Sequence, residues 1–574
     1  MAIGAGVGLA AVAAWAGYTA YEATQIKLNL ERAADFSVRS KDALLAGDAT
    51  AAADAARQAD RYAGDARQGT ESIGWRVAAA LPGVGDPFRS AREMTDVVGG
   101  LTSEVLPPAV RAGAALSPDH LLQSGARINV QSLRDAAPDV AEAAAAAQNW
   151  ADRAGAVSGS FVGPVDDART ELVARTQELS SMLGSVSTAA EIAPAMLGAD
   201  GPRSYFIGFQ TNAEARGTGG LLGGFGELLA TDGAIRVDEL ASNRELAVDG
   251  KRPLDLGPDF ERLYGQSRPT TDFRNSNISS HFPYAAQIWQ SLWEQESGER
   301  VDGVIATDPV ALSYVLGVVG PVTMPDGEKV TADNVVELTE STAYSRFADN
   351  NTARKRYLQT VAAKVVEKMT GKIAKPRDLL EALGRAAGEG RLAVWSAHPD
   401  EQDVIAGTRL GQTVPDSDAP YAGVVVNNLG GNKLDYYLQR DIEYRGGTCT
   451  GDTRSTTVTV RLTNTLPPGD YTTYVAGMFD NPRGAPAGTN LTNLSLVATR
   501  GAKLDKATVD GKPGFAFTGN ELGHPVYDLQ FAIPQGETVE VVYHLTEPAV
   551  AGEAEVAVQP LVDEPRIATV VEPC

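Results

Sequence analysis

The chain is short of cysteine, histidine and aromatic residues, and these shortages argue against several classes of protein. Two of its 574 residues are cysteine and five are histidine, while aromatic residues make up 6%. The histidines are scattered, with no HExxH motif and no Cys/His cluster, so we expect no catalytic zinc site. The absence of a GxSxG motif argues against the common serine hydrolases.

Basic residues are also scarce relative to acidic ones. The chain has 50 Lys and Arg against 73 Asp and Glu, which gives a formal net charge of -23. Such a surface repels a phosphate backbone, so we expect no nucleic-acid partner. It would also be repelled by an anionic membrane, except through a local basic patch or an apolar anchor.

The first residues supply a candidate anchor. Residues 2–20, AIGAGVGLAAVAAWAGYTA, carry no charge over about the length that a helix needs to cross a bilayer. A cleavable signal peptide is the alternative, but it would need a charged n-region and a small-x-small cleavage site, and neither is clear. We therefore predict a single-pass transmembrane anchor over residues 1–22, with the lipid bilayer as a partner. The rest of the chain would lie outside the cytoplasm, at the cell membrane.

The remainder of the sequence changes character twice. Residues 23–198 are Ala-rich and helical in pattern, which indicates a helical stalk or bundle. In residues 199–428, strands alternate with helices as in an α/β domain, and Asp232-Gly233 predicts a hairpin turn between two of the strands. Residues 429–574 contain short alternating strands between Gly, Pro and Asp turns, which is typical of an Ig-like β-sandwich. The predicted fold class is a multidomain α+β protein with a transmembrane helix, a stalk, an α/β domain and a β-sandwich.

Both cysteines, Cys449 and Cys574, lie in the last region. In an exported protein they would most simply pair with each other. Closing a loop of that size stabilises a domain by about 4 kcal/mol in the chain-entropy model. Two free thiols are the cytoplasmic alternative, and we favour the disulfide.

One helix start gathers cations in this otherwise acidic chain. In residues 343–369, AYSRFADNNTARKRYLQTVAAKVVEKM, apolar residues recur at helical spacing from Arg354 onward, after the candidate N-cap residues 350–352. Arg346, Lys355 and Arg356 join Arg354 around this start, where the helix dipole disfavours positive charge. A bound phosphate would relieve that cost. The alternative is that the cations pair with acidic neighbours.

A glycine-rich stretch precedes this helix. Residues 216–226, RGTGGLLGGFG, lack the Lys-Ser/Thr of a P-loop and do not fit GxGxxG. The glycines allow the backbone to approach a ligand closely. A flexible turn between two strands explains them equally well.

The order of features from Ser204 to Met369 resembles the LytR-CpsA-Psr enzymes. These are membrane-anchored, extracytoplasmic phosphotransferases that move glycans from polyprenyl pyrophosphate onto the cell wall. The likeness is carried by an arginine after the first strand, an Arg-acidic step in SNREL, an Asn-bearing loop and a Tyr-x-Arg step before the cationic helix. The resemblance implies phosphate binding by Arg216, Arg244, Asn275, Arg346, Arg354, Arg356 and Gln359.

The same resemblance implies a catalytic role for Glu214 or Asp349, as base or as ligand of a metal such as Mg²⁺. The enzymes place one aspartate beside the first arginine and another at the start of the second strand. Here Asn212 and Glu214 occupy the first region, and residues 223–226 occupy the second. Metal-assisted transfer needs such carboxylates. Phosphate binding by arginine forks needs only donors.

Taken whole, the chain more closely resembles the domain of unknown function family 4012, which is common among actinobacterial envelope proteins. The stretches GFQTNAEARGTGGLLGGFGELLATDG and NNLGGNKLDYYLQRDIEYR carry this likeness. We therefore predict an envelope protein that binds a polyprenyl-phosphate-linked or phosphorylated glycan. If it is an enzyme, it would be a glycan phosphotransferase. The rival prediction is a non-enzymatic scaffold that joins protein partners in an envelope or surface-polymer assembly. It predicts cationic side chains engaged by internal carboxylates, and no pocket with apolar walls for a lipid chain.

Overall fold

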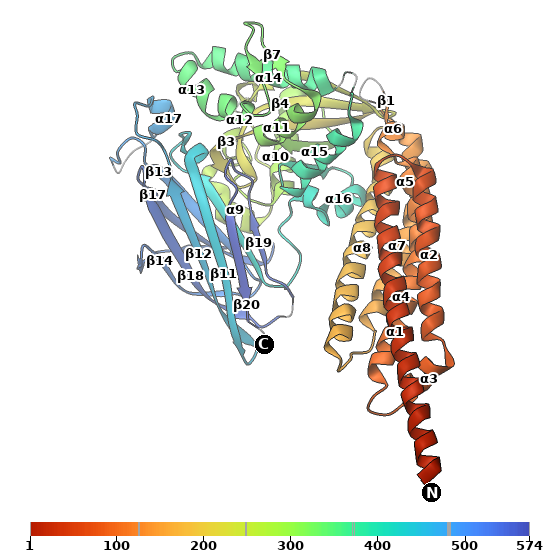
Figure 1. Ribbon diagram of the computed structural model, residues 1–574. Coiled ribbons are helices and arrows are strands. Elements are labelled where there is room, and N and C mark those ends of the chain that lie inside the picture. The colour runs from red at the N-terminus through yellow and green to blue at the C-terminus, as the bar shows by residue number, and fades with distance from the viewer. Residues whose placement is uncertain are drawn as a thin grey trace. The chain divides into compact units, whose positions relative to one another are not determined.

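The chain folds as two compact units, which are described separately below (Figure 1). The computed structural model describes residues 2–123, 127–246, 250–369, 371, 373–478, 484–550 and 552–572, without the side chains of residues 2–20. Unit 1 comprises Met1–Gln123, Arg127–Pro202 and Thr231–Ala234. Unit 2 comprises Ser124–Ala126, Arg203–Ala230 and Ile235–Cys574.

Unit 1 is a helical bundle (Figure 1). Its helices are α1 (Ala2–Leu45), α2 (Ala49–Thr70), α3 (Ile73–Ala80), α4 (Asp86–Gly100), η1 (Leu101–Val105), α5 (Leu106–Ala115), α6 (Pro118–Leu121), α7 (Val130–Gly155) and α8 (Gly163–Met196). In α2 the buried side chains are Ala52, Ala56, Ala59, Ala63 and Ala66. Their alternating spacing of four and three residues is the heptad pattern of packed helices, and alanine lets the helices approach closely.

The predicted transmembrane helix is corrected. Within the part of the chain that the structure describes, no helix is both long and apolar enough to cross a bilayer. From Tyr21 onward α1 is a bundle helix, with Ile26 and Ala33 buried and Lys27 paired with Glu31 on its exposed side. The side chains of residues 2–20, on which the prediction rested, lie outside the described residues. The fold is a multidomain α+β arrangement, and its described residues do not include the predicted membrane-spanning helix.

The first part of unit 2 is built on a mixed sheet. Its strands are β3 (Arg203–Arg216), β4 (Gly219–Thr231), β5 (Ala234–Ser242), β6 (Gly303–Thr307) and β9 (Leu392–Ser396). They follow one another in the order β5-β4-β3-β6-β9, and β3 runs parallel to β6. Asp232 and Gly233 turn β4 into β5 with positive φ at both residues, as a tight hairpin requires. The predicted strands and the Asp-Gly hairpin are confirmed.

Helices cover this sheet on its two faces. Helix α10 (Phe282–Ser297) buries Ile288, Trp289 and Leu292 in a core with Phe206 and Phe225 of the sheet. Helix α9 (Pro258–Tyr264) adds Phe260 and Tyr264 to the same core. The elements that cover the other face or flank the sheet are α11 (Pro309–Val319), β7 (Val322–Thr323), β8 (Lys329–Val330), α12 (Val335–Glu337), η5 (Leu338–Thr342), α13 (Ala343–Arg346), α14 (Asn351–Met369), α15 (Pro376–Gly388) and α16 (Pro399–Ala406). Asn350 caps α14, because its Oδ1 accepts from the amide of Ala353 at 2.9 Å. The predicted cap is thus confirmed.

The rest of unit 2 is a β-sandwich (Figure 1). Its strands are β10 (Tyr421–Asn428), β11 (Leu438–Thr450), β12 (Thr453–Asn464), β13 (Asn490–Ala498), β14 (Lys503–Val509), β15 (Lys512–Pro513), β16 (Phe517–Glu521), β17 (His524–Ile533), β18 (Thr538–Pro548), β19 (Glu555–Val558) and β20 (Arg566–Val571). One sheet has the order β16-β17-β13-β10-β19 and the other β15-β14-β18-β12-β11-β20. Apolar side chains of both sheets, including Val424 and Tyr543, share one core. Strand β10 precedes the boundary predicted at residue 429.

The end of β20 lies beside the first cysteine. Arg454 Nη2 donates to the carbonyl of Glu572 at 3.3 Å and contacts Cys449 Sγ at 3.7 Å. Cys574 lies outside the described residues, so its pairing with Cys449 stays a prediction.

Candidate functional site

A pocket opens in unit 2 between the sheet and its helical cover. Its cavity volume is about 110 Å³, within about 770 Å³ of empty space that includes the open mouth. Strands β3, β4 and β5 form one wall, and α11, η5 and α14 form the other. Its apolar lining includes Phe209, Leu240, Leu312, Leu358, Val361 and Ala362.

Two glycines of β4 keep the sheet wall of this pocket open. Gly223 and Gly224 both line the pocket. A Cβ at Gly223 would lie 2.6 Å from Thr211 Oγ1, so a larger side chain would require the wall to shift. Most of the glycine-rich stretch is strand rather than loop. Its glycines leave backbone exposed where a ligand can approach it.

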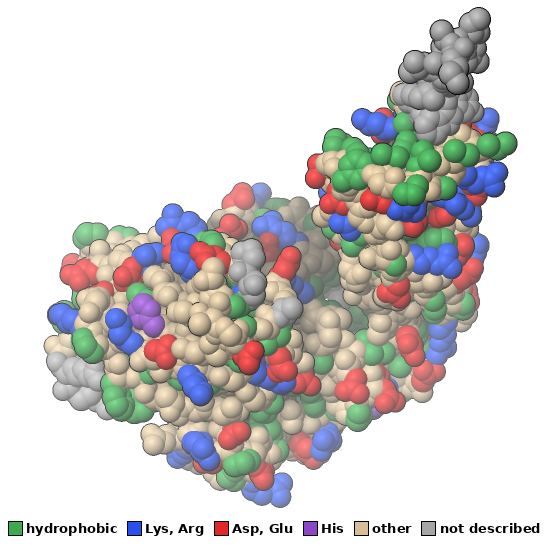
Figure 2. Space-filling view, turned by 90° about the horizontal axis from the view of Figure 1, so that it is seen from below, with side chains coloured by type: hydrophobic (Ala, Val, Ile, Leu, Met, Phe, Trp, Pro, Cys, Tyr) green, Lys and Arg blue, Asp and Glu red, His purple; other side chains and the backbone are tan. Residues whose placement is uncertain are grey.

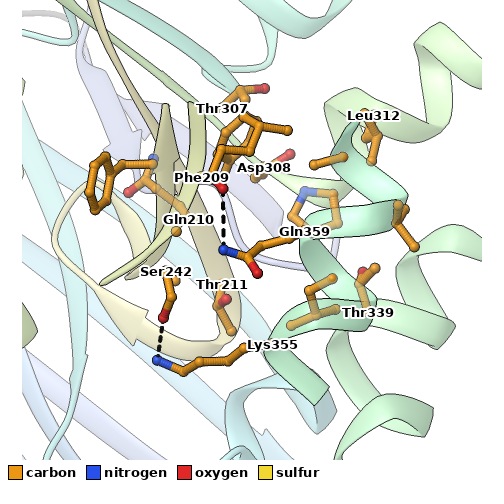
Figure 3. Close-up of a pocket in the computed structure, with 18 of the residues that line it drawn as sticks. Phe209, Gln210, Thr211, Ser242, Thr307, Asp308, Leu312, Thr339, Lys355 and Gln359 are labelled. Carbon is orange, nitrogen blue, oxygen red and sulfur yellow. Dashed lines mark hydrogen bonds between the residues drawn. The ribbon is translucent and has the colours of Figure 1, made fainter. Parts of the chain in front are cut away.

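Two polar side chains of α14 reach across the pocket to the end of β5 (Figure 3). Lys355 Nζ donates to Ser242 Oγ at 2.8 Å and also to Asn243 Oδ1. One turn further on, Gln359 Nε2 donates to the carbonyl of Leu240 at 3.2 Å. Spacing of four residues places both side chains on the same face of the helix.

Lys355 is a cation without a matching anion. Among the described residues, no carboxylate lies within ion-pair distance of its Nζ, and both of its partners are neutral oxygens. Burial, and then the positive charges of Arg244 and Arg354, lower its pKa to about 8. The lysine is therefore still mostly protonated at pH 7, at a cost that a bound anion would offset.

Glu340 is a buried carboxyl group on the pocket wall. It belongs to η5, is 2% exposed, and accepts at Oε2 from the amide of Ala213 at 2.7 Å. Burial, assisted by the negative charge of Asp308, raises its pKa to about 8. The group is therefore mostly neutral at pH 7 and can donate a hydrogen bond from its protonated oxygen.

Asp308 is the other acidic residue on the wall, and it is held by protein groups. Its Oδ1 caps α11 by accepting from the amide of Ala311 at 2.8 Å, and its Oδ2 pairs with Arg391 at 2.9 Å. Burial raises the pKa of Asp308 despite the opposing effect of Arg391. Because both oxygens are bonded, Asp308 leaves little negative charge to repel an anionic ligand.

The structure places the first predicted pair outside this pocket. Glu214 lies within a register shift of β3 between Thr211 and Ala215, and Arg216 ends the strand just after it. There Glu214 Oε1 pairs with Arg216 at 3.0 Å, and its Oε2 pairs with Lys433. Burial alone would raise the pKa of Glu214, but Lys433 and Arg216 lower it.

Arg216 is also fixed by backbone groups of unit 2. Its Nε donates to the carbonyl of Arg274 at 2.9 Å, and its Nη1 donates to the carbonyls of Ala215 and Asn428. Both Arg216 and Glu214 are less than a tenth exposed. This pair joins the α/β part to the sandwich and leaves no donor directed at a pocket ligand.

The cationic side chains around the start of α14 lie in different environments. Arg346 forms a two-fold contact with Glu328, at 2.7 and 2.9 Å, which raises the pKa of the guanidinium group. Arg354 is 3% exposed and stacks on the rings of Tyr344 and Tyr474, at 4.9 and 4.2 Å from their centroids. Arg346 therefore pairs with an acidic neighbour, which was the alternative to a bound phosphate. Arg354 is instead stabilised by cation–π contacts.

The remaining predicted residues are dispersed. Arg244, Arg356 and Asp349 are exposed, and Asn275 donates to the carbonyl of Ser267 at 2.8 Å. None of these four lines the pocket, whereas Gln359 does. The predicted arginines therefore do not form its wall, and Glu214 and Asp349 do not meet there.

The residues present do not fit the Mg²⁺ that the resemblance implied. Among the described residues, no group of three or more His, Cys, Asp or Glu side chains is placed to hold a metal ion. Glu214 is already committed to two cations. A divalent ion prefers several free oxygen ligands, so we derive no reaction step through a metal.

Sequence reasoning missed three pocket residues as site residues. Lys355 was noticed only as part of the cationic helix start, although its spacing from Gln359 is a signal that could have selected it. Asp308 was not selected, because an aspartate before the first turn of a helix is an ordinary cap. Glu340 had no motif, because its burial depends on the packing of η5 against β3.

Comparison with known proteins identifies one family. Residues 200–344 match the model of the family described as "Protein of unknown function (DUF4012)", which supports the predicted assignment of this region to that family. The match includes β3 to β6 and ends within α13, before Lys355 and Gln359. No curated protein and no solved structure matches the chain significantly.

Proposed function

We propose that unit 2, which carries the DUF4012 match, binds an amphipathic ligand in its pocket. The ligand has an apolar chain and a phosphate head, and belongs to the class of polyprenyl-phosphate-linked glycans. The observation that carries the proposal is an open apolar pocket whose one lysine lacks a carboxylate partner among the described residues. The glycan class and an extracytoplasmic location are the expectations that came from the sequence resemblance.

The apolar walls provide the affinity for the chain. Leu240, Leu312, Leu358 and Val361 face a space large enough for several prenyl carbons. Each Å² of apolar surface removed from water contributes about 25 cal/mol. The chain would therefore bind mainly through burial, and the polar residues would fix its direction.

Lys355 and Gln359 provide the recognition of the head group. Lys355 now donates to neutral oxygens, and a phosphate oxygen would be a stronger, charge-assisted acceptor. Gln359 can donate beside it from the same helix face. Because Glu340 is neutral at pH 7, its side chain adds a donor to the pocket rather than a repelling charge.

A titration with farnesyl phosphate tests this proposal. We expect it to bind more tightly than farnesol, which lacks the phosphate, and than inorganic phosphate, which lacks the chain. Lys355→Ala should weaken farnesyl phosphate binding at least tenfold, and Ala362→Phe should weaken farnesyl phosphate and farnesol alike by filling the pocket. Lys364→Ala is the matched control, because Lys364 lies on the same helix and pairs with Glu367 at the surface.

Two results would overturn the proposal. One is equal binding of farnesyl phosphate by the parent and by Lys355→Ala, with both proteins folded by circular dichroism. The other is a parent that binds farnesyl phosphate no better than inorganic phosphate. Either would leave the scaffold as the better account.

The scaffold remains the second candidate because of one specific observation. It predicted that cationic side chains are neutralised internally, and Arg216 and Arg346 are paired with Glu214 and Glu328. It also predicted no pocket with apolar walls, and unit 2 has one. The pocket therefore favours the binding function over the scaffold.

A further inference from the structure

Strand β20 lies at an edge of the sandwich of unit 2, beside β11 (Figure 1). It runs parallel to β11, and no strand among the described residues pairs with its other edge. Residues 566–570 are exposed, with Ile567 at 44% and Val570 at 43%. The strand therefore presents unpaired backbone groups and apolar side chains to solvent.

The other outer strands of the two sandwich sheets are β15, β16 and β19, and each is protected. β15 consists only of Lys512 and Pro513, and β19 has four residues and begins with Glu555. β16 packs against α9, where a Cβ at Gly519 would lie 2.1 Å from the side chain of Leu263. Short strands, Lys, Pro and a covering helix are ways to prevent pairing at an edge. β20 has six residues without Lys, Pro or Gly, and most of them are β-branched, which favours strands.

The hydrogen bonds to β11 determine which backbone groups of β20 remain unpaired. The amide of Glu572, just after the strand, donates to the carbonyl of Gly446 on β11 at 2.9 Å. Because successive residues of a strand direct their backbone groups to opposite edges, Ile567, Thr569 and Val571 direct theirs away from β11. These three residues can therefore exchange hydrogen bonds with one further strand.

A second β20 fits this edge when the two copies run antiparallel about a two-fold axis at Thr569. In an antiparallel pair, opposite residues whose backbone groups face each other exchange both hydrogen bonds. Thr569 then lies opposite Thr569 of the second copy, and Ile567 lies opposite Val571, so the outward groups of all three residues are bonded. The same register places Arg566 opposite Glu572 of the second copy, and opposite charges across two strands stabilise the pairing.

The charges beside β20 do not form a block of one sign. On the neighbouring strand β11, Asp441 pairs with Arg566 at 3.0 Å, and Glu443 pairs with Arg445. The side chain of Arg566 is 86% exposed, so it can contact a second carboxylate as well. On the face of unit 2 that Figure 2 shows, acidic and basic side chains are interspersed. The net charge of the chain therefore does not by itself oppose contact at this edge.

The acidic residues at the two ends of β20 differ in their partners. Before the strand, Asp563 pairs with Arg440 at 2.8 Å, and Glu564 lies close enough to Arg385 to raise the pKa of its guanidinium group. After the strand, Glu572 is exposed, and no cation among the described residues pairs with it. Glu572 is thus an acidic group of this edge whose charge a second copy would match.

We infer that β20 is a docking surface for a second copy of this chain, and that two β20 strands pair antiparallel to join two sandwiches into one continuous sheet. The unpaired backbone groups require an extended strand as occupant. The match of Arg566 with Glu572 under two-fold symmetry favours the same strand of a second copy. A contact of one strand from each copy is small, so the dimer should be weak. This inference concerns the sandwich and does not depend on the pocket.

Sedimentation equilibrium of the full chain tests this inference. The parent should pass from monomer to dimer between about 1 and 100 µM. Thr569→Pro should raise the dissociation constant at least tenfold, because proline removes the central amide donor and cannot pair at that edge. The amide of Thr569 points away from β11, so the variant should keep its fold, which circular dichroism verifies. The matched control is Thr569→Val, which keeps the amide and should dimerise as the parent does.

A charge exchange tests the register. Glu572→Arg should raise the dissociation constant about tenfold, because it places two cations opposite each other. Arg566→Glu plus Glu572→Arg should restore it to within about threefold of the parent value, because the pair is re-formed with its signs exchanged. The control is Glu537→Arg, which makes the same change of charge at an exposed residue before β18, three strands away from β20.

Three results would overturn the inference. The first is a parent that stays monomeric at about 100 µM. The second is a Thr569→Pro protein that dimerises as the parent does. The third is a double charge variant that dimerises no better than Glu572→Arg, or a Glu537→Arg protein that weakens as much, because the contact would then lie elsewhere.

Discussion

Two lysines of unit 2 differ in whether a carboxylate neutralises their charge. Lys433, at the junction with the sandwich, is 3% exposed and pairs with Glu214, which also pairs with Arg216. Lys355, in the pocket, is half-buried and donates only to Ser242 and Asn243. The protein neutralises the first cation itself and leaves the second without a counter-ion. A buried ion pair mainly fixes structure, whereas an unmatched cation in an open pocket is suited to a ligand.

The difference arises from the elements that carry the two lysines. Within its register shift, β3 places Glu214 beside Lys433 at the junction with the sandwich. Helix α14 instead presents Lys355 to the end of β5, where its hydrogen-bond partners are the hydroxyl of Ser242 and the amide oxygen of Asn243. The acidic composition of the chain therefore does not determine which cations are paired.

The largest expected effect comes from removing the carboxylate that Lys433 and Arg216 share. Glu214→Ala leaves Lys433 and Arg216 buried without their shared anion, and we expect the free energy of unfolding to fall by about 3–5 kcal/mol. Urea denaturation followed by circular dichroism measures this change. The control is Glu328→Ala, which removes the partner of the half-exposed Arg346 and should cost about 1 kcal/mol or less. Equal losses in the two variants would contradict the comparison.

Elements with a strong local pattern could be predicted from the sequence, and features that depend on packing could not. The strands on either side of Asp232 and the start of α14 were correct, because turn chemistry and helical spacing are local signals. The transmembrane helix was wrong for the described residues. An uncharged Ala- and Gly-rich run has no pattern that separates a membrane helix from the Ala-rich helices of a bundle.

The candidate site was harder to predict than the fold. Of the predicted residues Gln359 lines the pocket, whereas Arg216 and Arg346 pair with carboxylates that the sequence places 2 and 18 residues from them. Which of several nearby cations meets an anion depends on the direction of each side chain on its helix or strand. The neutral state of Glu340 likewise depends on burial between η5 and β3.

The second prediction concerns the carboxyl group beside the unmatched lysine. Burial raises the pKa of Glu340 from 4.5 to about 8, so between those values the folded protein binds the proton that the unfolded chain has lost. Stability from this group therefore falls as pH rises from 4.5 to 8. Glu340→Gln removes that dependence, and we expect it to be more stable than the parent by about 3 kcal/mol at pH 7, at about 1.4 kcal/mol per pH unit.

Urea midpoints at pH 4.5 and pH 7 measure this second effect. The variant and the parent should differ little at pH 4.5, where the carboxyl group is protonated in the folded protein and half protonated in the unfolded chain. Parallel pH dependence of the two proteins would show that Glu340 titrates normally in the fold. It would then repel the phosphate that the pocket is proposed to bind.

The smallest expected effect is a change in farnesyl phosphate binding when Lys355 loses its charge. Its pKa is about 8, so between pH 7 and pH 9 the pocket loses its cation, and farnesyl phosphate binding should weaken by up to about tenfold. Lys355→Arg should bind almost equally at both values, because guanidinium stays protonated. Both proteins should carry Glu340→Gln, which removes the other group that titrates near pH 8. If the lysine and arginine proteins weaken in parallel, the charge on residue 355 does not hold the phosphate.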